Sequence, residues 1–204
     1  AHWESALLAA GVARVRINTH HLAEAVDCFA RGAHNRSAMR WETVHEPTLL
    51  GSAGTIAANA DFADGAETVL VIYADNLSDI DLAAMLTAHR QSGLPVTMAL
   101  FHAPNPRACG IATLDGGGVV SEFVEKPTTP RSELANAGVY AFTPAAWLEV
   151  AMMRAFDLGF DVLPRFVGRM LGFPIRGYHR DIGTPAALVE ADEVLRARSL
   201  GASS

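Results

Sequence analysis

Cysteines, long apolar runs and excess positive charge are all scarce in this 204-residue chain. Its two cysteines, Cys28 and Cys109, stand among apolar residues without C-x-x-C spacing, so we expect two reduced core thiols and neither a disulfide nor a metal site. No apolar run approaches the roughly 18 to 20 residues that cross a membrane. Residues 1–5 also lack the basic and apolar regions of a secretory signal. We therefore expect a cytoplasmic protein with no membrane partner.

The charge balance excludes further classes of partner. The chain has 16 Lys and Arg against 22 Asp and Glu, a formal net charge of −6. Non-specific binding to nucleic acid has little electrostatic support, so we expect no nucleic-acid partner, and any phosphate must be held locally. Half of the residues are apolar and 19% are charged, which suits one compact domain and argues against disorder, collagen or a coiled coil.

Short β-like runs alternate with helical stretches in the first half of the chain. This order indicates βαβ units and predicts an α/β fold with a mixed, mostly parallel sheet flanked by helices. The expected strands are residues 14–18, 43–46, 68–73 and 96–101, and the expected helices are residues 21–31, 54–59 and 79–89.

The second half changes character around the triple glycine Gly116–Gly118, which suits a hairpin turn. After it we expect a strand at 135–142, helices at 145–154 and 161–170, a strand at 175–179, a helix at 185–198 and a flexible tail at 199–204. There is no internal repeat or low-complexity linker. We therefore predict one domain, residues 1–198, with halves at 1–105 and 106–198.

Residues Leu8 to Arg16 superficially resemble the glycine-rich loop L-A-A-G-x-G-T-R-x-R with which sugar nucleotidyltransferases hold a triphosphate. Such a loop follows a buried strand and needs glycines, so that backbone N–H groups can approach the phosphates. Here the preceding residues, 2–8, have a helical pattern and the second glycine is replaced by Ala13. We interpret Gly11 as the C-cap of a helix, followed by the strand that begins at Arg14.

Two aspartates each follow an apolar, strand-like run: Asp75 comes after VLVIY and Asp181 after IRGYH. Open α/β sheets place their ligands at the carboxyl ends of strands. Two carboxylates brought together there would suit Mg²⁺, which completes its shell with water and substrate phosphates. Each residue could equally turn the chain, because aspartate favours turns.

Glu125, Lys126 and Pro127 end another strand. Lys126 could bind a phosphate and Glu125 could accept hydrogen bonds from sugar hydroxyls; the alternative is a solvated surface pair. The small-residue segments 136–138 and 50–54 could bring a ligand to the backbone or serve as ordinary turns. Ser52 has the character of an N-cap for a helix that begins at Ala53.

Other motifs favour structural interpretations. Asp79-Ile80-Asp81 is similar to the D-x-D metal motif of glycosyltransferases, but acidic residues also favour the first turn of a helix, and we prefer that interpretation. His20, His21 and His45 lack the spacing of a zinc site.

Taken in order, these segments resemble the sugar nucleotidyltransferase (NDP-sugar pyrophosphorylase) family, particularly its mannose-1-phosphate guanylyltransferase branch and the bacterial heptose-phosphate relatives. The resemblance implies a Rossmann-like fold with a small sugar-binding lobe, Mg²⁺ as cofactor, and a nucleoside triphosphate and a sugar 1-phosphate as substrates, with GTP and mannose 1-phosphate or a heptose phosphate favoured. The resemblance leaves open whether the protein forms a homo-oligomer. The segments that carry it are INTHHLAEAV (17–26), EPTLLGSAGTI (46–56), VIYADN (71–76), CGIATLD (109–115), FVEKP (123–127), ANAGVYAF (135–142), DLGFDVLP (157–164) and DIGTP (181–185).

The resemblance also implies roles for individual residues. Catalysis would fall to Asp75, Asp181 and Lys126, with both aspartates as metal ligands and the lysine on the sugar phosphate. Gly110, Glu125 and Asn136 would hold the sugar. The nucleotide would lie against Glu46, Gly51, Ser52, Ala53 and Gly54, in a sequence form that looks most like guanylyltransferases.

One departure from the family pattern is large, because the N-terminal strand, the glycine-rich loop and its lysine have no match here. We expect that the sequence lacks a preceding segment, the alternative being a protein that has lost the loop. Either way, we expect this chain to bind a nucleoside triphosphate weakly and to turn it over slowly. The alternative functions are a non-catalytic nucleotide-sugar-binding regulatory subunit and a metal-dependent glycosyltransferase that uses Asp79 and Asp81.

Overall fold

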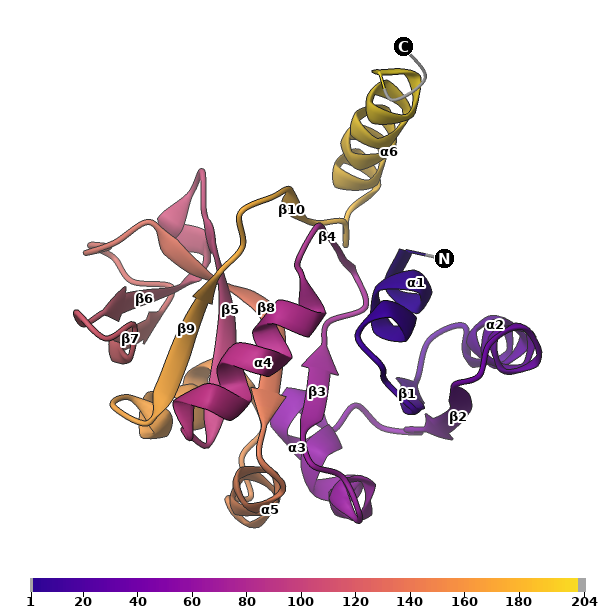
Figure 1. The fold of residues 1–204 in the computed structure, drawn as a ribbon, viewed down its shortest axis with the longest axis horizontal. Helices are drawn as coiled ribbons and strands as arrows, with labels where there is room; N and C mark the ends of the chain where they lie inside the picture. Colours follow the sequence, from indigo (N-terminus) through magenta and orange to yellow (C-terminus); the bar gives the residue numbers. More distant parts are fainter. Residues whose placement is uncertain (1, 202–204) are drawn as a thin grey trace.

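The computed structural model describes residues 2–201, and its N-terminal unit is built from two helices and two parallel strands (Figure 1). The helix α1 ends at Gly11, whose φ of 74° is left-handed, and the Val12 N–H donates to the Leu7 carbonyl at 3.0 Å. These are the marks of a glycine C-cap, so the helix-cap interpretation is confirmed. The unit comprises α1 (His2–Ala9), β1 (Arg14–Thr19), α2 (Ala23–Arg36) and β2 (Arg40–His45).

The central sheet has six strands, in the order β7-β6-β8-β5-β9, with β3 also paired to β8. The sheet is mixed, as predicted, but the expectation of mostly parallel pairing is wrong. Within the described strands of this sheet only β5 and β9 pair in parallel, because β8 runs against each of its neighbours and β7 runs against β6. The strands are β3 (Val69–Ile72), β5 (Val96–His102), β6 (Gly110–Leu114), β7 (Val120–Glu125), β8 (Leu134–Phe142) and β9 (Met170–Pro174).

Helices cover both faces of this sheet, which makes three layers. Side chains alternate along β8, so that Tyr140 and Phe142 join one buried cluster while Val139 and Ala141 join the other. The first cluster is covered by α3 (Gly51–Ala58) and α5 (Pro144–Met152), and the second by α1 and α4 (Leu82–Ser92).

The region between α5 and the C-terminal helix differs most from expectation. The α-helix predicted at 161–170 is absent from the described structure. The chain there forms the end of a π turn, η3 (Leu158–Val162), then a 3-10 turn, η4 (Leu163–Phe166), and the start of β9. Of the strand predicted at 175–179, residues 175–178 form a connection and only His179 belongs to a strand, β10 (His179–Asp181). A short apolar run such as 170–174 suits a helix and a strand equally well, which is why its pattern misleads.

Near the C-terminus, β10 pairs antiparallel with β4 (Asn76–Ser78), and the chain then enters α6 (Pro185–Gly201). Thr184 caps this helix by accepting the Ala187 N–H at 3.2 Å. The helix projects from the body and includes the first residues of the predicted tail, while residues 202–204 lie outside the described part (Figure 1).

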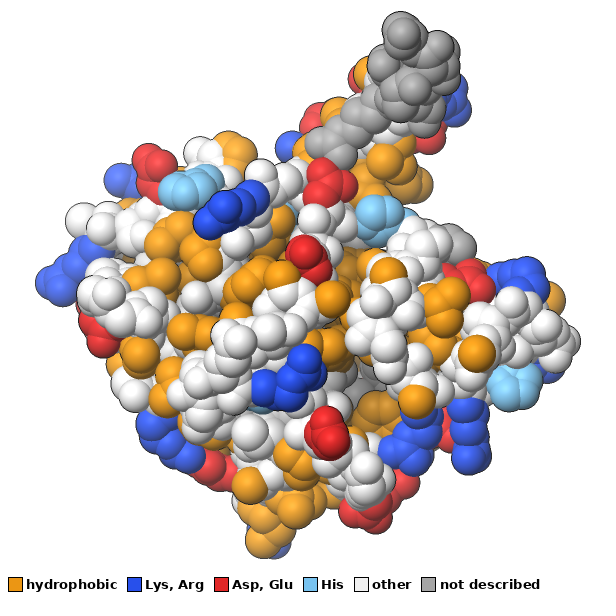
Figure 2. Space-filling view, in the orientation of Figure 1, with side chains coloured by type: hydrophobic (Ala, Val, Ile, Leu, Met, Phe, Trp, Pro, Cys, Tyr) orange, Lys and Arg blue, Asp and Glu red, His pale blue; other side chains and the backbone are white. Residues whose placement is uncertain are grey.

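Surface features bear on two further expectations. Cys28 is exposed on α2, so the prediction of a core thiol there is wrong, because its position on the helix faces solvent. Acidic and basic side chains are interspersed on the face in Figure 2, without a continuous basic patch. Within residues 2–201 no helix is both long and apolar enough to span a bilayer.

Candidate functional site

Asp75 and Asp181 lie side by side where β4 meets β10. The Ile182 N–H donates to the Asp75 carbonyl at 2.7 Å, which fixes the two segments next to each other. A Cβ built on Gly183 would lie 3.2 Å from Asp75 Oδ2 and 3.0 Å from Asp181 Oδ1. Both aspartates are exposed. Two residues that are far apart in the sequence therefore present their carboxylates to the same small space.

This pair suits a magnesium ion that is shared with a substrate. Magnesium commonly takes one or two protein carboxylates and fills its other positions with water and phosphate oxygens. Among the described residues no cluster of three or more His, Cys, Asp or Glu side chains forms a complete metal cage. Asp75 and Asp181 thus have the chemistry of a magnesium site that is completed by a phosphate.

Glu125 and Gly110 face each other across the β6–β7 hairpin. The Glu125 carboxylate fills the space that a side chain at Gly110 would need, and it also lies 2.6 Å from the position of a Cβ on Gly159. Burial raises the pKa of Glu125, the nearby Asp157 charge raises it further, and Lys126 opposes both effects. The carboxylate is therefore held between two glycines in a partly dehydrated place.

Lys126 follows directly, in a left-handed conformation with a φ of 49°. Its N–H donates to the Cys109 carbonyl at 3.0 Å, and its Nζ lies 5.9 Å from the centre of the Phe160 ring. Burial raises the pKa of the Cys109 thiol, and the charges of Glu125 and Asp181 raise it while Lys126 lowers it. Asp181, Glu125 and Lys126 thus all act on the same thiol.

Asn136 lies on β8, where both ends of its amide have protein partners. Its Nδ2 donates to the Tyr140 hydroxyl at 2.7 Å and its Oδ1 accepts the Gly138 N–H at 3.0 Å. Gly138 is left-handed, and a Cβ there would lie 2.8 Å from Asn76 and from the Tyr73 ring. Since Oδ1 has a second lone pair, Asn136 can still accept from a ligand.

The segment Gly51–Gly54 forms the first turn of α3, not the loop before it. The prediction of Ser52 as N-cap is wrong: Leu50 occupies that position, and the Ser52 hydroxyl instead donates to Asp157 Oδ2 at 3.3 Å. The Ala53 N–H donates to the Phe156 carbonyl at 3.0 Å, so one free donor expected for a ligand is already used.

Glu46 lies behind this segment and is 4% exposed. Its carboxylate accepts the Thr55 hydroxyl at 2.7 Å and the Leu50 N–H at 3.5 Å. Through these two hydrogen bonds the buried Glu46 carboxylate holds the segment that leads into α3.

Sequence reasoning missed Asp157 and Gly159. Asp157 caps η3 by accepting the Phe160 N–H at 2.9 Å, and its Oδ1 lies 3.2 Å from the Cβ position of Gly159, beside Glu125. The segment DLGFDVLP contributes to the family resemblance, and an aspartate at its start was the available signal.

The D-x-D pair serves the backbone. Asp81 caps α4 by accepting the Ala84 N–H at 2.8 Å, which supports the helix-start interpretation. Asp79, however, lies ahead of the helix and accepts the Tyr178 N–H at 2.9 Å. Neither carboxylate lies with the Asp75–Asp181 pair at Gly183.

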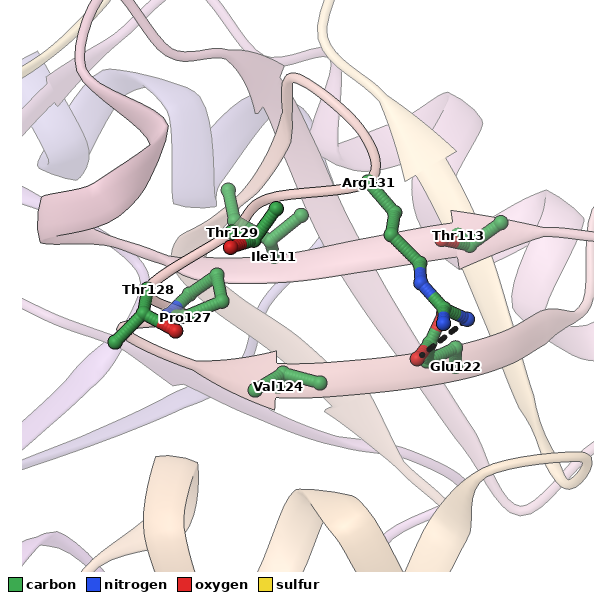
Figure 3. A pocket seen from close by; sticks show the side chains of 8 residues that line it. All are labelled: Ile111, Thr113, Glu122, Val124, Pro127, Thr128, Thr129 and Arg131. Carbon is green, nitrogen blue, oxygen red and sulfur yellow. Dashed lines mark hydrogen bonds and ion pairs between the residues drawn. The ribbon is translucent and has the colours of Figure 1, made fainter.

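A cavity of about 230 Å³ lies on the other face of the β6–β7 hairpin (Figure 3). Alternation along the strands turns the Glu122 and Val124 side chains toward this cavity and the Glu125 side chain away from it. Arg131 crosses its mouth to pair with Glu122 at 3.4 Å. The cavity is therefore separate from the carboxylate cluster.

Comparison with known proteins gives consistent matches. The family model described as nucleotidyl transferase matches residues 2–198. The chain is 29% identical over 188 residues to the mannose-1-phosphate guanylyltransferase catalytic subunit beta of Danio rerio, covering 90% of this chain and 52% of that protein. It is 32% identical over 160 residues to a glucose-1-phosphate adenylyltransferase of Desulfitobacterium hafniense, covering 72% of this chain and 40% of that protein. The chain thus spans about half the length, or less, of these curated relatives.

Among solved structures, the fold is similar to that of a putative glucose-1-phosphate thymidylyltransferase from Bacillus anthracis. The TM-score is 0.82 at 20% sequence identity, and the match covers 96% of this chain and 81% of the other. The similarity in fold extends over both halves of the molecule.

Proposed function

Because this chain belongs to the nucleotidyl transferase family, we propose that it takes part in joining a sugar 1-phosphate to a nucleoside monophosphate unit. In the proposed reaction an oxygen of the sugar phosphate attacks the α-phosphorus of a nucleoside triphosphate. The new P–O bond forms as the bond to pyrophosphate breaks, so the products are an NDP-sugar and pyrophosphate. No covalent enzyme intermediate is needed.

The observation that carries this proposal is the approach of Asp75 and Asp181 to the same space at Gly183. Asp181 Oδ1 accepts the Gly183 N–H at 2.7 Å, which explains one of the two carboxylates as a turn residue, but two like charges near one another still destabilise a fold unless a cation offsets them. Magnesium bound there would neutralise charge on phosphate oxygens. Asp181, Glu125 and Lys126 all influence the pKa of the Cys109 thiol, which supports placing them around one site, as a reaction between two phosphates requires.

The residues of this chain would mainly bind and orient the substrates. Glu125 accepts hydrogen bonds from sugar hydroxyls, and the exposed Lys126 places its charge on the sugar phosphate. The Asn136 side-chain oxygen offers a further hydrogen-bond acceptor. Because Gly110 has no side chain, the Glu125 carboxylate can occupy the space beside it. The first turn of α3, which contacts Asp157 through Ser52, would receive the nucleotide. Alignment of this kind supplies a large share of the rate in phosphoryl chemistry.

We further propose GTP and mannose 1-phosphate, or a related heptose phosphate, as substrates. Support comes from the sequence form Leu50-Gly51-Ser52-Ala53-Gly54 and from the guanylyltransferase relative. Adenylyl and thymidylyl enzymes are also among the similar proteins, so the base must be tested.

The test is a pyrophosphate-release assay, with Mg²⁺, on three substrate pairs: GTP with mannose 1-phosphate, ATP with glucose 1-phosphate, and dTTP with glucose 1-phosphate. Calorimetric binding of the corresponding NDP-sugars accompanies it. We expect preference for the first pair and slow turnover, because Gly11 closes a helix and Leu8–Arg16 offers no phosphate-binding loop. Preference for another pair refutes the assignment of GTP. Tight NDP-sugar binding without turnover favours the regulatory-subunit alternative, and absence of both refutes the proposal.

A further inference from the structure

Phe160 exposes its ring on the turn η3, next to two residues of the proposed sugar-phosphate site. The residue is 58% exposed and, within the described part of the chain, joins no buried cluster. Lys126 Nζ lies over the ring, 5.9 Å from its centre. The preceding residue, Gly159, has the Glu125 carboxylate where its side chain would begin. Phe160 and its neighbour thus meet both the lysine proposed for the phosphate and the carboxylate proposed for the sugar hydroxyls.

The turn that carries Phe160 is held by side-chain hydrogen bonds. Asp157 Oδ1 accepts the Phe160 N–H at 2.9 Å, and Asp161 Oδ2 accepts the Asp157 N–H at 2.9 Å. Ser52 ties the same turn to α3, because its hydroxyl accepts the Leu158 N–H at 2.8 Å and donates to Asp157 Oδ2 at 3.3 Å. Single π turns of this kind are uncommon and often lie at functional sites. The backbone that carries the Phe160 ring is therefore fixed before a ligand binds.

Neither the turn nor the core requires an aromatic side chain at this position. The contact of Phe160 with Asp157 is made by the backbone N–H, which any residue except proline supplies. A single exposed apolar side chain is common on protein surfaces and needs no ligand to explain it. Phe160 differs from that case because charged groups of the proposed site lie at this residue and at the one before it. An apolar ring among such groups indicates a ligand that is itself polar at some points and apolar at others.

A pyranose ring has this mixed surface. Its hydroxyls project around the rim, while C–H bonds gather on its faces. The face of an aromatic ring is electrically negative, so it attracts the slightly positive hydrogens of C–H bonds. A sugar 1-phosphate that placed its phosphate on Lys126 and its hydroxyls on Glu125 would bring a C–H face to the Phe160 ring.

We propose that Phe160 is a specificity-determining contact for the sugar, and that a C–H face of the bound pyranose stacks on its ring. This inference rests on the proposed function of the site and names the class of sugar that the site prefers, a closed six-membered ring. An open-chain sugar-alcohol phosphate carries the same phosphate and similar hydroxyls, but it has no such face and gains nothing from Phe160.

The experiment compares mannose 1-phosphate with mannitol 1-phosphate, its open-chain counterpart. Each is titrated calorimetrically into the protein with Mg²⁺ and the α,β-methylene analogue of GTP, which cannot release pyrophosphate. Phe160→Leu keeps an apolar side chain without an aromatic face, and Phe160→Trp keeps an aromatic face. Phe29→Leu is the matched control, since Phe29 is also partly exposed but lies on α2, where its ring packs against Trp41.

We expect Phe160→Leu to bind mannose 1-phosphate about 3- to 10-fold more weakly than wild type, the usual range for an aromatic contact. Its affinity for mannitol 1-phosphate should not change, and Phe160→Trp and Phe29→Leu should bind both ligands as the wild type does. Saturation-transfer NMR gives a second measurement, which a change in folding would not imitate. Transfer from aromatic protons of the protein to the sugar C–H protons should fall in Phe160→Leu, compared at equal fractions of bound ligand, and persist in Phe160→Trp.

Equal affinity of wild type and Phe160→Leu for mannose 1-phosphate overturns the inference. An equal loss for mannitol 1-phosphate also overturns it, because Phe160 would then act only by holding Lys126. Failure of the wild type to bind mannose 1-phosphate and glucose 1-phosphate instead refutes the proposed function, and the inference falls with it.

Discussion

Replacing Gly159 with alanine should displace the Glu125 carboxylate while leaving the fold intact. The added Cβ would lie 2.6 Å from Glu125 Oε2 and 3.2 Å from Asp157 Oδ1. The distance to Glu125 is too short for two non-bonded atoms, so the Glu125 carboxylate must move. Within the described residues the Glu125 carboxylate has no hydrogen-bond partner, so it can swing away cheaply. Gly159 has no left-handed φ, so alanine can adopt its backbone conformation without the strain of a left-handed residue. We therefore expect little change in thermal stability.

The loss of affinity follows from the bonds that Glu125 would no longer make. A hydrogen bond to a charged group contributes about 1.5 to 3 kcal/mol. At roughly 1.4 kcal/mol for each factor of ten, mannose 1-phosphate should bind about 10- to 150-fold more weakly. The nucleotide should keep its affinity, because the contact of Asp157 with Ser52 is made through the other carboxylate oxygen.

Calorimetric titration of the sugar phosphate into the protein with Mg²⁺ and the GTP analogue measures this effect. Gly116→Ala is the matched control, since that glycine lies in the β6–β7 turn and an added Cβ meets nothing within 4 Å. Equal sugar-phosphate affinity in Gly159→Ala, Gly116→Ala and wild type would exclude Glu125 as a sugar ligand. A parallel loss of nucleotide affinity would show that Asp157 had moved instead.

Three further variants test the rest of the site. Gly183→Ala would press on both metal-site aspartates, at 3.0 and 3.2 Å, and should weaken Mn²⁺ binding, measured by electron paramagnetic resonance, by about 10-fold; unchanged binding would exclude a shared metal there. Lys126→Ala should weaken sugar-phosphate binding in the same calorimetric assay by about 10-fold, the low end for a charged hydrogen bond because the lysine is exposed; an unchanged affinity would remove it from the site. Glu125→Gln should raise the melting temperature near neutral pH, because burial raises the pKa of this carboxyl and its ionised form therefore opposes folding. That gain should shrink as pH falls through the raised pKa and vanish below the unfolded value, and a gain that does not depend on pH would contradict the reasoning.

The sequence predicted local elements best where a side-chain pattern was long or ended in a strong cap. The helix end at Gly11 and the hairpin around Gly116–Gly118 are examples, since each depends on a few neighbouring residues. The convergence of Asp75 and Asp181 is different. Each could be placed after an apolar run, but their contact depends on the pairing of β4 with β10, which joins segments about a hundred residues apart. Only the family resemblance linked them in advance.

The region from Leu158 to Pro174 shows where pattern alone fails. Apolar residues recur there at spacings that suit a helix, but Pro164 and the left-handed Gly168 break the chain into a π turn, a 3-10 turn and β9. The same error hid Asp157, because the helix expected at 161–170 begins four residues after it and gave it no role. Its second contact, with Ser52, comes from an element more than a hundred residues earlier.

Three glycines of the site are needed because they have no side chain, more than because of their backbone conformation. Gly110, Gly159 and Gly183 have no left-handed φ, yet at each a carboxylate oxygen lies where a side chain would begin. Closeness to a carboxylate does not suffice as a mark of function, because Gly177 has the same relation to Asp79. The difference lies in the partners: Asp79 accepts the Tyr178 N–H, whereas Glu125 between its two glycines accepts no hydrogen bond from the described residues. A half-buried carboxylate that glycines accommodate and the protein leaves unsatisfied is best explained by a ligand that donates to it, as the hydroxyls of a sugar do.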